Sequence, residues 1–224
     1  MALHNEMSYN PSPPSKIAFF CEVTPEKGTG RTPLASSEEI LTRVPAEVRK
    51  IYKEKGLMYI VNAPSEGKGP GVSWQRMYET EDRNEVDRVC ASMGIETKWR
   101  DDGSLCTYRT ATSTRTHPVT GREVWFNHSH LFHTSDLPPK TQAALDRIYP
   151  SKEHFPKNCM FADGSEIPKE YLDSVRKAQA DSTMSWDWQK GDLMLLDNFV
   201  LCHGRNKYSP TRKPKRRILA SMLF

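Results

Sequence analysis

Short apolar segments, each bounded by glycine, proline or polar turn residues, recur along this chain of 224 residues. The clearest lies near the end, where Gly191-Asp192 forms a turn and Leu193 to His203 is predicted to be a strand with a polar Asp-Asn break. Lys16 to Val23 and Arg217 to Met222 show the same strand pattern. Such strands, separated by short helices and irregular loops, favour a mainly β fold, a sandwich or jelly roll with flanking helices, over an alternating βαβ sheet.

Helices and loops are expected between these strands. Ser36, followed three residues later by Glu39, is the signature of a capping box, so a helix is predicted to begin there, to restart at Pro45 and to end at Gly56. The remaining expected elements are helices at 84–93, 141–149 and 169–180, a strand at 57–61, paired strands between 97 and 127, and loops at 28–33 and 64–75.

Composition limits the class of protein. With 37% hydrophobic residues the chain can bury a core, and we expect one domain over residues 1–224. No apolar run approaches the roughly 18 residues of a membrane span, and the first residues do not resemble a signal peptide. The five cysteines are scattered, which indicates reduced, mostly buried thiols. We therefore expect a soluble cytoplasmic protein without a membrane partner.

His4, Glu6 and His203 form the most informative combination of side chains. His4 and Glu6 are separated by one residue, so on an extended segment both side chains project from the same face. If a distant strand brings His203 against them, two neutral nitrogens and one carboxylate share one face of a metal and leave three positions open. Each part alone is weak, because short H-x-E triplets are common and a late histidine is usually a packed core residue. The combination predicts a ferrous site.

Two arginines open the last predicted strand. Arg217 lies fourteen residues after His203, and its planar guanidinium suits bidentate recognition of a carboxylate. Arg216 is expected on the opposite face of a regular strand, so Arg217 is the predicted carboxylate ligand, with the Thr32 hydroxyl as a second donor. The alternative is that both arginines belong to a solvated basic patch.

Seven motifs in order along almost the whole chain resemble the TauD/TfdA family, most closely its clavaminate-synthase-like branch. The motifs are His4-Asn-Glu6, Phe19-Phe-Cys-Glu22, Gly30-Arg-Thr-Pro33, Val124-Trp-Phe-Asn127, Trp188-Gln-Lys-Gly-Asp-Leu-Met-Leu-Leu-Asp-Asn198, His203-Gly-Arg205 and Arg216-Arg-Ile-Leu-Ala220. Seven motifs in the expected order are far harder to obtain by chance than any single one.

The resemblance implies a double-stranded β-helix (jelly roll) and an Fe(II)- and 2-oxoglutarate-dependent dioxygenase that consumes O2. By matching position, His4, Glu6 and His203 would hold iron, and Thr32 and Arg217 would hold the far carboxylate of 2-oxoglutarate. Halogenating relatives replace the carboxylate ligand, so Glu6 implies hydroxylation or desaturation. The expected substrate is a small amino-acid-like or organic acid molecule.

The position of the H-x-E motif supports an alternative. Family members carry a longer segment before this motif, whereas here it begins at residue 4. A truncated, catalytically inactive member of the same fold, acting as a binding module, is therefore the second hypothesis.

Other polar residues have two interpretations each. Asn127 either contacts substrate or caps a strand, and Arg205 either meets a substrate carboxylate or forms a surface ion pair. The cluster His128-x-His130-x-x-His133 is interpreted as a loop or substrate-facing surface rather than a second metal site. The basic run from Thr211 to Arg217 is interpreted as a solvated loop, and no nucleic-acid partner is expected because no recognition motif accompanies it.

Overall fold

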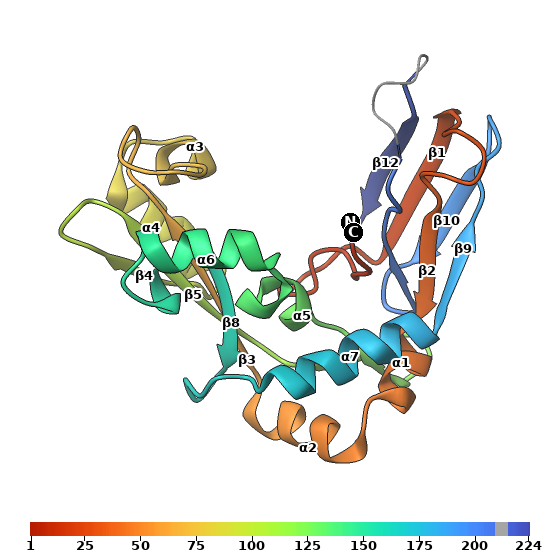
Figure 1. Ribbon diagram of the computed structural model, residues 1–224, viewed down its shortest axis with the longest axis horizontal. Coiled ribbons are helices and arrows are strands. Elements are labelled where there is room, and N and C mark those ends of the chain that lie inside the picture. Colours follow the sequence, from red (N-terminus) through yellow and green to blue (C-terminus); the bar gives the residue numbers. More distant parts are fainter. Residues whose placement is uncertain (209–214) are drawn as a thin grey trace. The chain divides into compact units, whose positions relative to one another are not determined.

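The structure is a computed structural model that describes residues 1–208 and 215–224, and it divides into two compact units (Figure 1). Unit 1 comprises Met1–Lys53, Thr112–His128 and Glu170–Phe224, and unit 2 comprises Glu54–Ala111 and Ser129–Lys169. The expected single domain over residues 1–224 stays a prediction. Within the described residues, no helix combines the length and the apolar character that a bilayer span requires.

Unit 1 contains three antiparallel sheets. Their strand orders are β10-β1-β12, β11-β2-β9 and β6-β7. The strands are β1 (Lys16–Val23), β2 (Thr32–Ser36), β6 (Thr114–Thr116), β7 (Glu123–Trp125), β9 (Thr183–Trp186), β10 (Leu193–Asp197), β11 (Leu201–His203) and β12 (Arg217–Leu223). The order shows that β1 pairs with strands from the far end of the chain, so the N-terminal and C-terminal segments form one sheet.

Strand β1 shows how local pattern and long-range pairing agree. Ile17 and Cys21 are buried, as expected for residues on one face of a strand with period two. Phe19, on the same face, pairs with Ala220 of β12 and with Met194 of β10. Residues of β12 at even numbers therefore lie on the face of the sheet that carries Phe19.

The helices of unit 1 are α1 (Ser37–Arg43), α2 (Ala46–Lys55, with its last two residues in unit 2) and α7 (Lys169–Asp181, with Lys169 in unit 2). Ser36 caps α1, because its Oγ accepts the backbone N–H of Glu39 at 3.3 Å. The helix after Pro45 ends at Gly56, whose φ of +61° is the left-handed conformation that favours glycine. The predicted N-cap at Ser36 and both helix boundaries are confirmed, whereas the Glu39 carboxylate pairs with Arg43 instead of completing the capping box.

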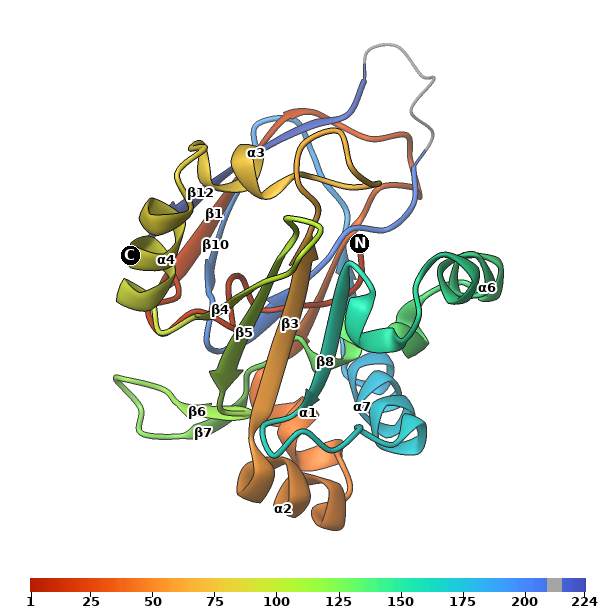
Figure 2. The same cartoon turned by 90° about the vertical axis from the view of Figure 1, so that its left-hand side faces the viewer.

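Unit 2 is built on one four-stranded antiparallel sheet of order β4-β5-β3-β8 (Figure 2). Its elements are β3 (Leu57–Ala63), α3 (Trp74–Tyr78), α4 (Arg83–Ser92), β4 (Glu96–Trp99), β5 (Leu105–Ala111), α5 (Ser129–Phe132), η1 (Thr134–Asp136), α6 (Pro139–Ile148), η2 (Lys152–His154) and β8 (Lys157–Phe161). Its core cluster consists of Ala63, Trp74, Val86, Cys90 and Leu105, with Tyr78, Ile95 and Trp99 packed against it. Burying these side chains stabilises the unit.

Most predicted elements are present, and the mainly β architecture of antiparallel sheets with flanking helices is confirmed. The loop predicted at 28–33 is wrong at its end, because Thr32 and Pro33 belong to β2 and pair with β9. Strands β8 and β9 were not expected. All five cysteines are free and buried, as predicted. Of the basic run 211–217, residues 211–214 lie outside the described residues.

Candidate metal centre

Backbone pairing between the two ends of unit 1 brings the H-x-E motif to the late histidine. His4 and His203 form an isolated antiparallel bridge, in which each backbone N–H donates to the other residue's carbonyl at 2.9 Å. His203 is the last residue of β11, which pairs with β2. The bridge therefore fixes His4 against the end of β11, as the sequence pattern predicted.

The three side chains converge on one point. Nε2 of His4 and Nε2 of His203 each lie 3.7 Å from Oε2 of Glu6. The three ligand atoms all lie within 4.8 Å of one another. Among the described residues, these three side chains form a group of His, Cys, Asp or Glu residues that could hold a metal ion. His4 and His203 are buried, whereas the Glu6 side chain is 26% exposed, so the group opens toward solvent on the carboxylate side.

Protonation at the site suits a cation. Nδ1 of His4 lies 3.0 Å from the carbonyl of Ala2; a carbonyl only accepts, so Nδ1 donates this bond and Nε2 is the ring nitrogen that faces Glu6. Burial, followed by repulsion from His4, lowers the pKa of His203 to about 4, so this imidazole is neutral at pH 7. The polar contact with His4 lowers the pKa of Glu6 more than burial raises it, so the carboxyl is ionised.

His203 is oriented by packing and by its backbone. Its Nδ1 is buried and has no hydrogen-bond partner within the described residues. The ring of Phe19 lies 5.2 Å from the ring of His203 in an edge arrangement, and the ring of His4 lies 4.5 Å away. The ring orientation therefore depends on these two contacts and on the bridge to His4.

The donor set fits a ferrous ion. Two neutral imidazole nitrogens and one carboxylate oxygen, with the carboxylate side open, match the 2-His-1-carboxylate arrangement that leaves positions for other ligands. Structural zinc sites, in contrast, close the coordination sphere with four protein ligands, often thiolates. The five cysteines are absent from this group.

Thr32 is buried at the start of β2. Its Oγ1 accepts the indole Nε1–H of Trp188 at 2.9 Å, and the ring of Trp188 lies 6.5 Å from that of Phe19. Because the hydroxyl accepts this bond, its own hydrogen is left to donate elsewhere. Trp188 is a core aromatic as predicted, whereas Trp186 is 43% exposed.

Arg217 has an environment that differs from the one expected for a carboxylate ligand, and its role in co-substrate binding stays a prediction. Its side chain is 64% exposed, and its Nε lies 2.7 Å from Oε2 of Glu22. The register between β1 and β12 shifts between Cys21 and Val23, and Arg217 lies opposite Val23. Along each strand, Glu22 and Arg217 alternate with the residues on the Phe19 face, so the pair lies on the opposite face of the sheet.

Arg216 has the environment that was expected for Arg217. It is half-buried, its Nε donates to the carbonyl of Gly30 at 3.2 Å, and its guanidinium lies 5.6 Å from the ring of Tyr208. Burial, and then the nearby Arg205, lowers the pKa of Arg216. A Cβ atom at Gly30 would lie 3.2 Å from Cδ of Arg216 and 2.8 Å from Cβ of Pro25, so this close approach requires glycine.

Asn127 and Arg205, the two predicted substrate-binding residues, differ in burial. Asn127 is buried and its Nδ2 donates to the carbonyl of Ser113 at 2.8 Å, which favours the structural interpretation. Arg205 is exposed; its backbone N–H donates to the carbonyl of Met1, and its guanidinium lies 5.6 Å from the ring of Tyr208. A role for either residue in substrate binding stays a prediction.

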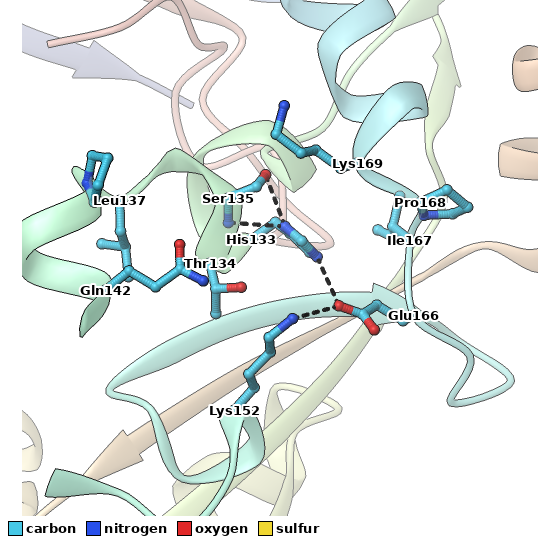
Figure 3. A pocket seen from close by; sticks show the side chains of 11 residues that line it. His133, Thr134, Ser135, Leu137, Gln142, Lys152, Glu166, Ile167, Pro168 and Lys169 are labelled. Carbon is cyan, nitrogen blue, oxygen red and sulfur yellow. Dashed lines mark hydrogen bonds and ion pairs between the residues drawn. The ribbon is translucent and has the colours of Figure 1, made fainter. Parts of the chain in front are cut away.

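The predicted histidine cluster is divided between the two units. In unit 1, Nε2 of His128 donates to the carbonyl of Asn5 at 2.7 Å. In unit 2, Nδ1 of His133 accepts the backbone N–H of Ser135 and so caps η1, while its Nε2 lies 4.0 Å from Glu166 (Figure 3). Glu166 in turn pairs with Lys152 at 2.8 Å along the wall of a cavity of about 560 Å³. His133 thus serves local structure in this cavity.

Of the two residues that hold the H-x-E segment, the sequence pattern marked Asn198, as part of the polar break in the strand predicted from Leu193 to His203, and gave no indication of Asn5. Asn5 lies between the two ligands and its side chain is fully hydrogen-bonded in the interior. Asn198 is completely buried beside Glu6 and is hydrogen-bonded to the Glu6 backbone, as a polar group that interrupts a buried strand requires. The signal in the sequence is a carboxamide at a position where a buried apolar residue is expected, because a buried polar group needs hydrogen-bond partners.

Comparisons with known proteins agree with this geometry. The model of the taurine catabolism dioxygenase TauD, TfdA family matches residues 1–222. The chain is 32% identical over 213 residues to dapdiamide synthesis protein DdaC of Enterobacter agglomerans, covering 95% of this chain and 63% of that protein. It is 26% identical over 228 residues to clavaminate synthase-like protein At3g21360 of Arabidopsis thaliana, covering 98% of this chain and 63% of that protein. The chain thus spans 63% of the length of these curated relatives.

Solved structures share the fold at low sequence identity. An asparagine oxygenase in complex with Fe(II), 2S,3S-3-hydroxyasparagine and succinate aligns with a TM-score of 0.58 and 10% identity, covering 99% of this chain and 49% of that one. AAD-2 in complex with Mn(II) and N-oxalylglycine aligns with a TM-score of 0.52 and 15% identity, covering 99% and 68%.

Proposed function

This chain belongs to the TauD/TfdA family, and on that premise we propose that it is a non-haem Fe(II)- and 2-oxoglutarate-dependent dioxygenase. The observation that carries the proposal is the convergence of His4, Glu6 and His203, whose ligand atoms lie within 4.8 Å of one another. The proposal includes the double-stranded β-helix of the family as the fold, supported by the two three-stranded antiparallel sheets of unit 1.

In this proposal the three side chains hold the metal from one face. Nε2 of His4 and Nε2 of His203 supply neutral donors, and the ionised Glu6 supplies the negative charge. When bound, iron with 2-oxoglutarate and O2 supplies the oxidising chemistry, in which the co-substrate is decarboxylated to succinate. The protein contributes fixed geometry and open positions on the exposed side of Glu6.

Arg216 and Thr32 are proposed to hold the far carboxylate of 2-oxoglutarate. Arg216 replaces Arg217 in this role because it is half-buried on the Phe19 side of the sheet, whereas Arg217 is exposed and paired with Glu22. A guanidinium in a partly desolvated place binds a carboxylate more strongly than one in water. The Thr32 hydroxyl, held by Trp188, supplies a further donor.

The proposed reaction is hydroxylation or desaturation of a small amino-acid-like or organic acid molecule. Glu6 supports this reaction type, because it occupies the position that a halide would need. The relative named for dapdiamide synthesis and the fold neighbour solved with 3-hydroxyasparagine are consistent with a substrate of amino-acid type. The net charge of +4 favours an anionic molecule.

Succinate formation tests the proposal. The purified chain with Fe(II), 2-oxoglutarate and O2 is expected to form succinate, slowly without substrate and faster with the right one. His203→Ala should abolish this turnover, and His154→Ala, which changes a histidine of unit 2 outside the triad, should leave it unchanged. Equal turnover in His203→Ala and the unmodified chain would refute the metal assignment. A folded chain without turnover or metal binding would support the inactive binding module instead.

A further inference from the structure

The backbone of Glu6 has an unusual partner. The bridge between His4 and His203 is isolated, so no regular strand continues alongside Glu6 within the described residues. Instead, the Glu6 N–H donates to Oδ1 of Asn198 at 2.7 Å, and the Glu6 carbonyl accepts from Nδ2 of Asn198 at 3.0 Å. This carboxamide thus makes the two hydrogen bonds that the backbone N–H and C=O of a partner residue make in an antiparallel hydrogen-bonded pair.

Asn198 is itself fixed in the interior. It is completely buried, and the second hydrogen of Nδ2 is donated to the carbonyl of Pro14 at 2.8 Å. Asp197 next to it accepts the backbone N–H groups of Phe199 and Val200, which closes the turn between β10 and β11. The side chain of Asn198 therefore has one available orientation.

Asn5 holds the same segment from the other side. Its Nδ2 donates to Oγ of Ser37 at 3.0 Å and to the backbone carbonyl of Asn198 at 2.7 Å, and its Oδ1 accepts from the thiol of Cys202 at 3.1 Å. Its side chain points away from the face shared by His4 and Glu6, as the alternation of an extended segment requires. We call Asn5 and Asn198 the carboxamide pair.

The Glu6 carboxylate depends on this support. Within the described residues, its polar contacts are the two imidazoles at 3.7 Å, and its side chain is 26% exposed. These contacts are too long to be hydrogen bonds, so they do not fix the carboxylate. Its position is set by the backbone of Glu6, which Asn198 holds at both its N–H and its carbonyl.

We propose that the carboxamide pair is a positioning device for the metal site, in which Asn198 places the Glu6 carboxylate and Asn5 braces the segment between the ligands. This inference rests on the proposed function. Groups that orient metal ligands typically affect metal affinity by about 10- to 100-fold. The pair therefore belongs to the metal-binding machinery although neither carboxamide is a ligand.

Asn198→Asp tests the proposal with little change in side-chain size. An aspartate oxygen in place of Nδ2 would face the carbonyl oxygens of Glu6 and Pro14, which repel it. The matched control is Asn84→Asp, at an exposed position in the first turn of α4. Anaerobic titration with Co(II), followed by its visible absorption, measures affinity and reports changes in the ligand set. We expect Asn198→Asp to raise the Kd about 10- to 100-fold and the control to change it less than about twofold.

A double-mutant cycle separates positioning from general structural damage. In the Glu6→Ala background there is no carboxylate to place, so adding Asn198→Asp should leave the Co(II) affinity and spectrum of Glu6→Ala nearly unchanged. A loss that persists undiminished in that background, or an unchanged Kd in Asn198→Asp alone, overturns the proposal.

Ser37→Ala is a milder second variant for the case that Asn198→Asp does not fold, because it removes one acceptor from Asn5. It should weaken Co(II) binding in the unmodified background and not in Glu6→Ala, and equal effects in both would contradict the proposal. If the unmodified chain binds no Co(II), this inference and the proposed function both fail. If it binds Co(II) and the cycle is additive, the inference alone fails.

Discussion

The assignment of the co-substrate arginine gives the sharpest mutational prediction, because two adjacent arginines have opposite environments. Arg216 is half-buried, and its Nε donates to the carbonyl of Gly30, two residues before the buried Thr32. Arg217 is 64% exposed and pairs with Glu22, whose side chain is 40% exposed. Replacing each by alanine should therefore have very different effects on 2-oxoglutarate binding.

The magnitudes follow from burial. Removing the partner of a desolvated carboxylate costs about 2–5 kcal/mol, which corresponds to a Kd for 2-oxoglutarate raised roughly 30- to 4,000-fold in Arg216→Ala. Removing an exposed ion pair costs about 0–1 kcal/mol of folding stability, and Arg217→Ala should leave the Kd within about twofold.

Anaerobic titration of the metal-loaded chain with 2-oxoglutarate measures both constants under one condition. Arg216→Lys is a useful third variant, because lysine keeps the charge and loses the bidentate fork, so it should recover only part of the affinity. A larger loss in Arg217→Ala than in Arg216→Ala would refute the reasoning and restore Arg217 as the ligand.

Three further predictions concern the surroundings of the site. Trp188→Phe removes the bond to Thr32 and should lower the free energy of unfolding by about 1 kcal/mol in urea titrations, whereas Trp186→Phe, at an exposed position, should change it little. The pKa of His203 is about 4 in the folded chain and 6.5 ordinarily, so the unfolded chain binds a proton at this residue more readily than the folded chain. Without metal, the free energy of unfolding should therefore fall as the pH drops from about 6.5 toward 4. His203→Gln should flatten this pH dependence. Burial raises the pKa of Cys202 to about 12, so this thiol and the other four should resist alkylation at pH 8 until the chain is unfolded, and rapid labelling of the native chain would contradict their burial.

Features fixed by local sequence were predicted well. The strand from Lys16 to Val23 has the predicted bounds, because its apolar pattern and its flanking turns act within a few residues. The helix after Ser36 begins where its cap and Glu39 place it. The juxtaposition of His4 and His203 was also predicted, although only the combination of residue types suggested it.

Features that depend on long-range pairing were predicted poorly. Thr32 lies among glycine and proline residues that predict a loop, yet pairing with β9 and β11 makes this segment a central strand. The environment of Arg217 depends on the register of β12 against β1, including a register shift that leaves no mark in the sequence. The role of Asn5 and the partners of Asn198 could not be derived either, because these partners lie 32 and 192 residues away.

The central claim is that His4, Glu6 and His203 hold iron together with 2-oxoglutarate, and one measurement tests it most directly. Fe(II) and then 2-oxoglutarate are added to the purified chain without oxygen, and the weak visible charge-transfer band of the chelated co-substrate is followed. The account predicts that the band appears in the unmodified chain and is absent in Glu6→Ala and His203→Ala at the same concentrations. A folded chain that gives no band, or variants that give the same band as the unmodified chain, would contradict it.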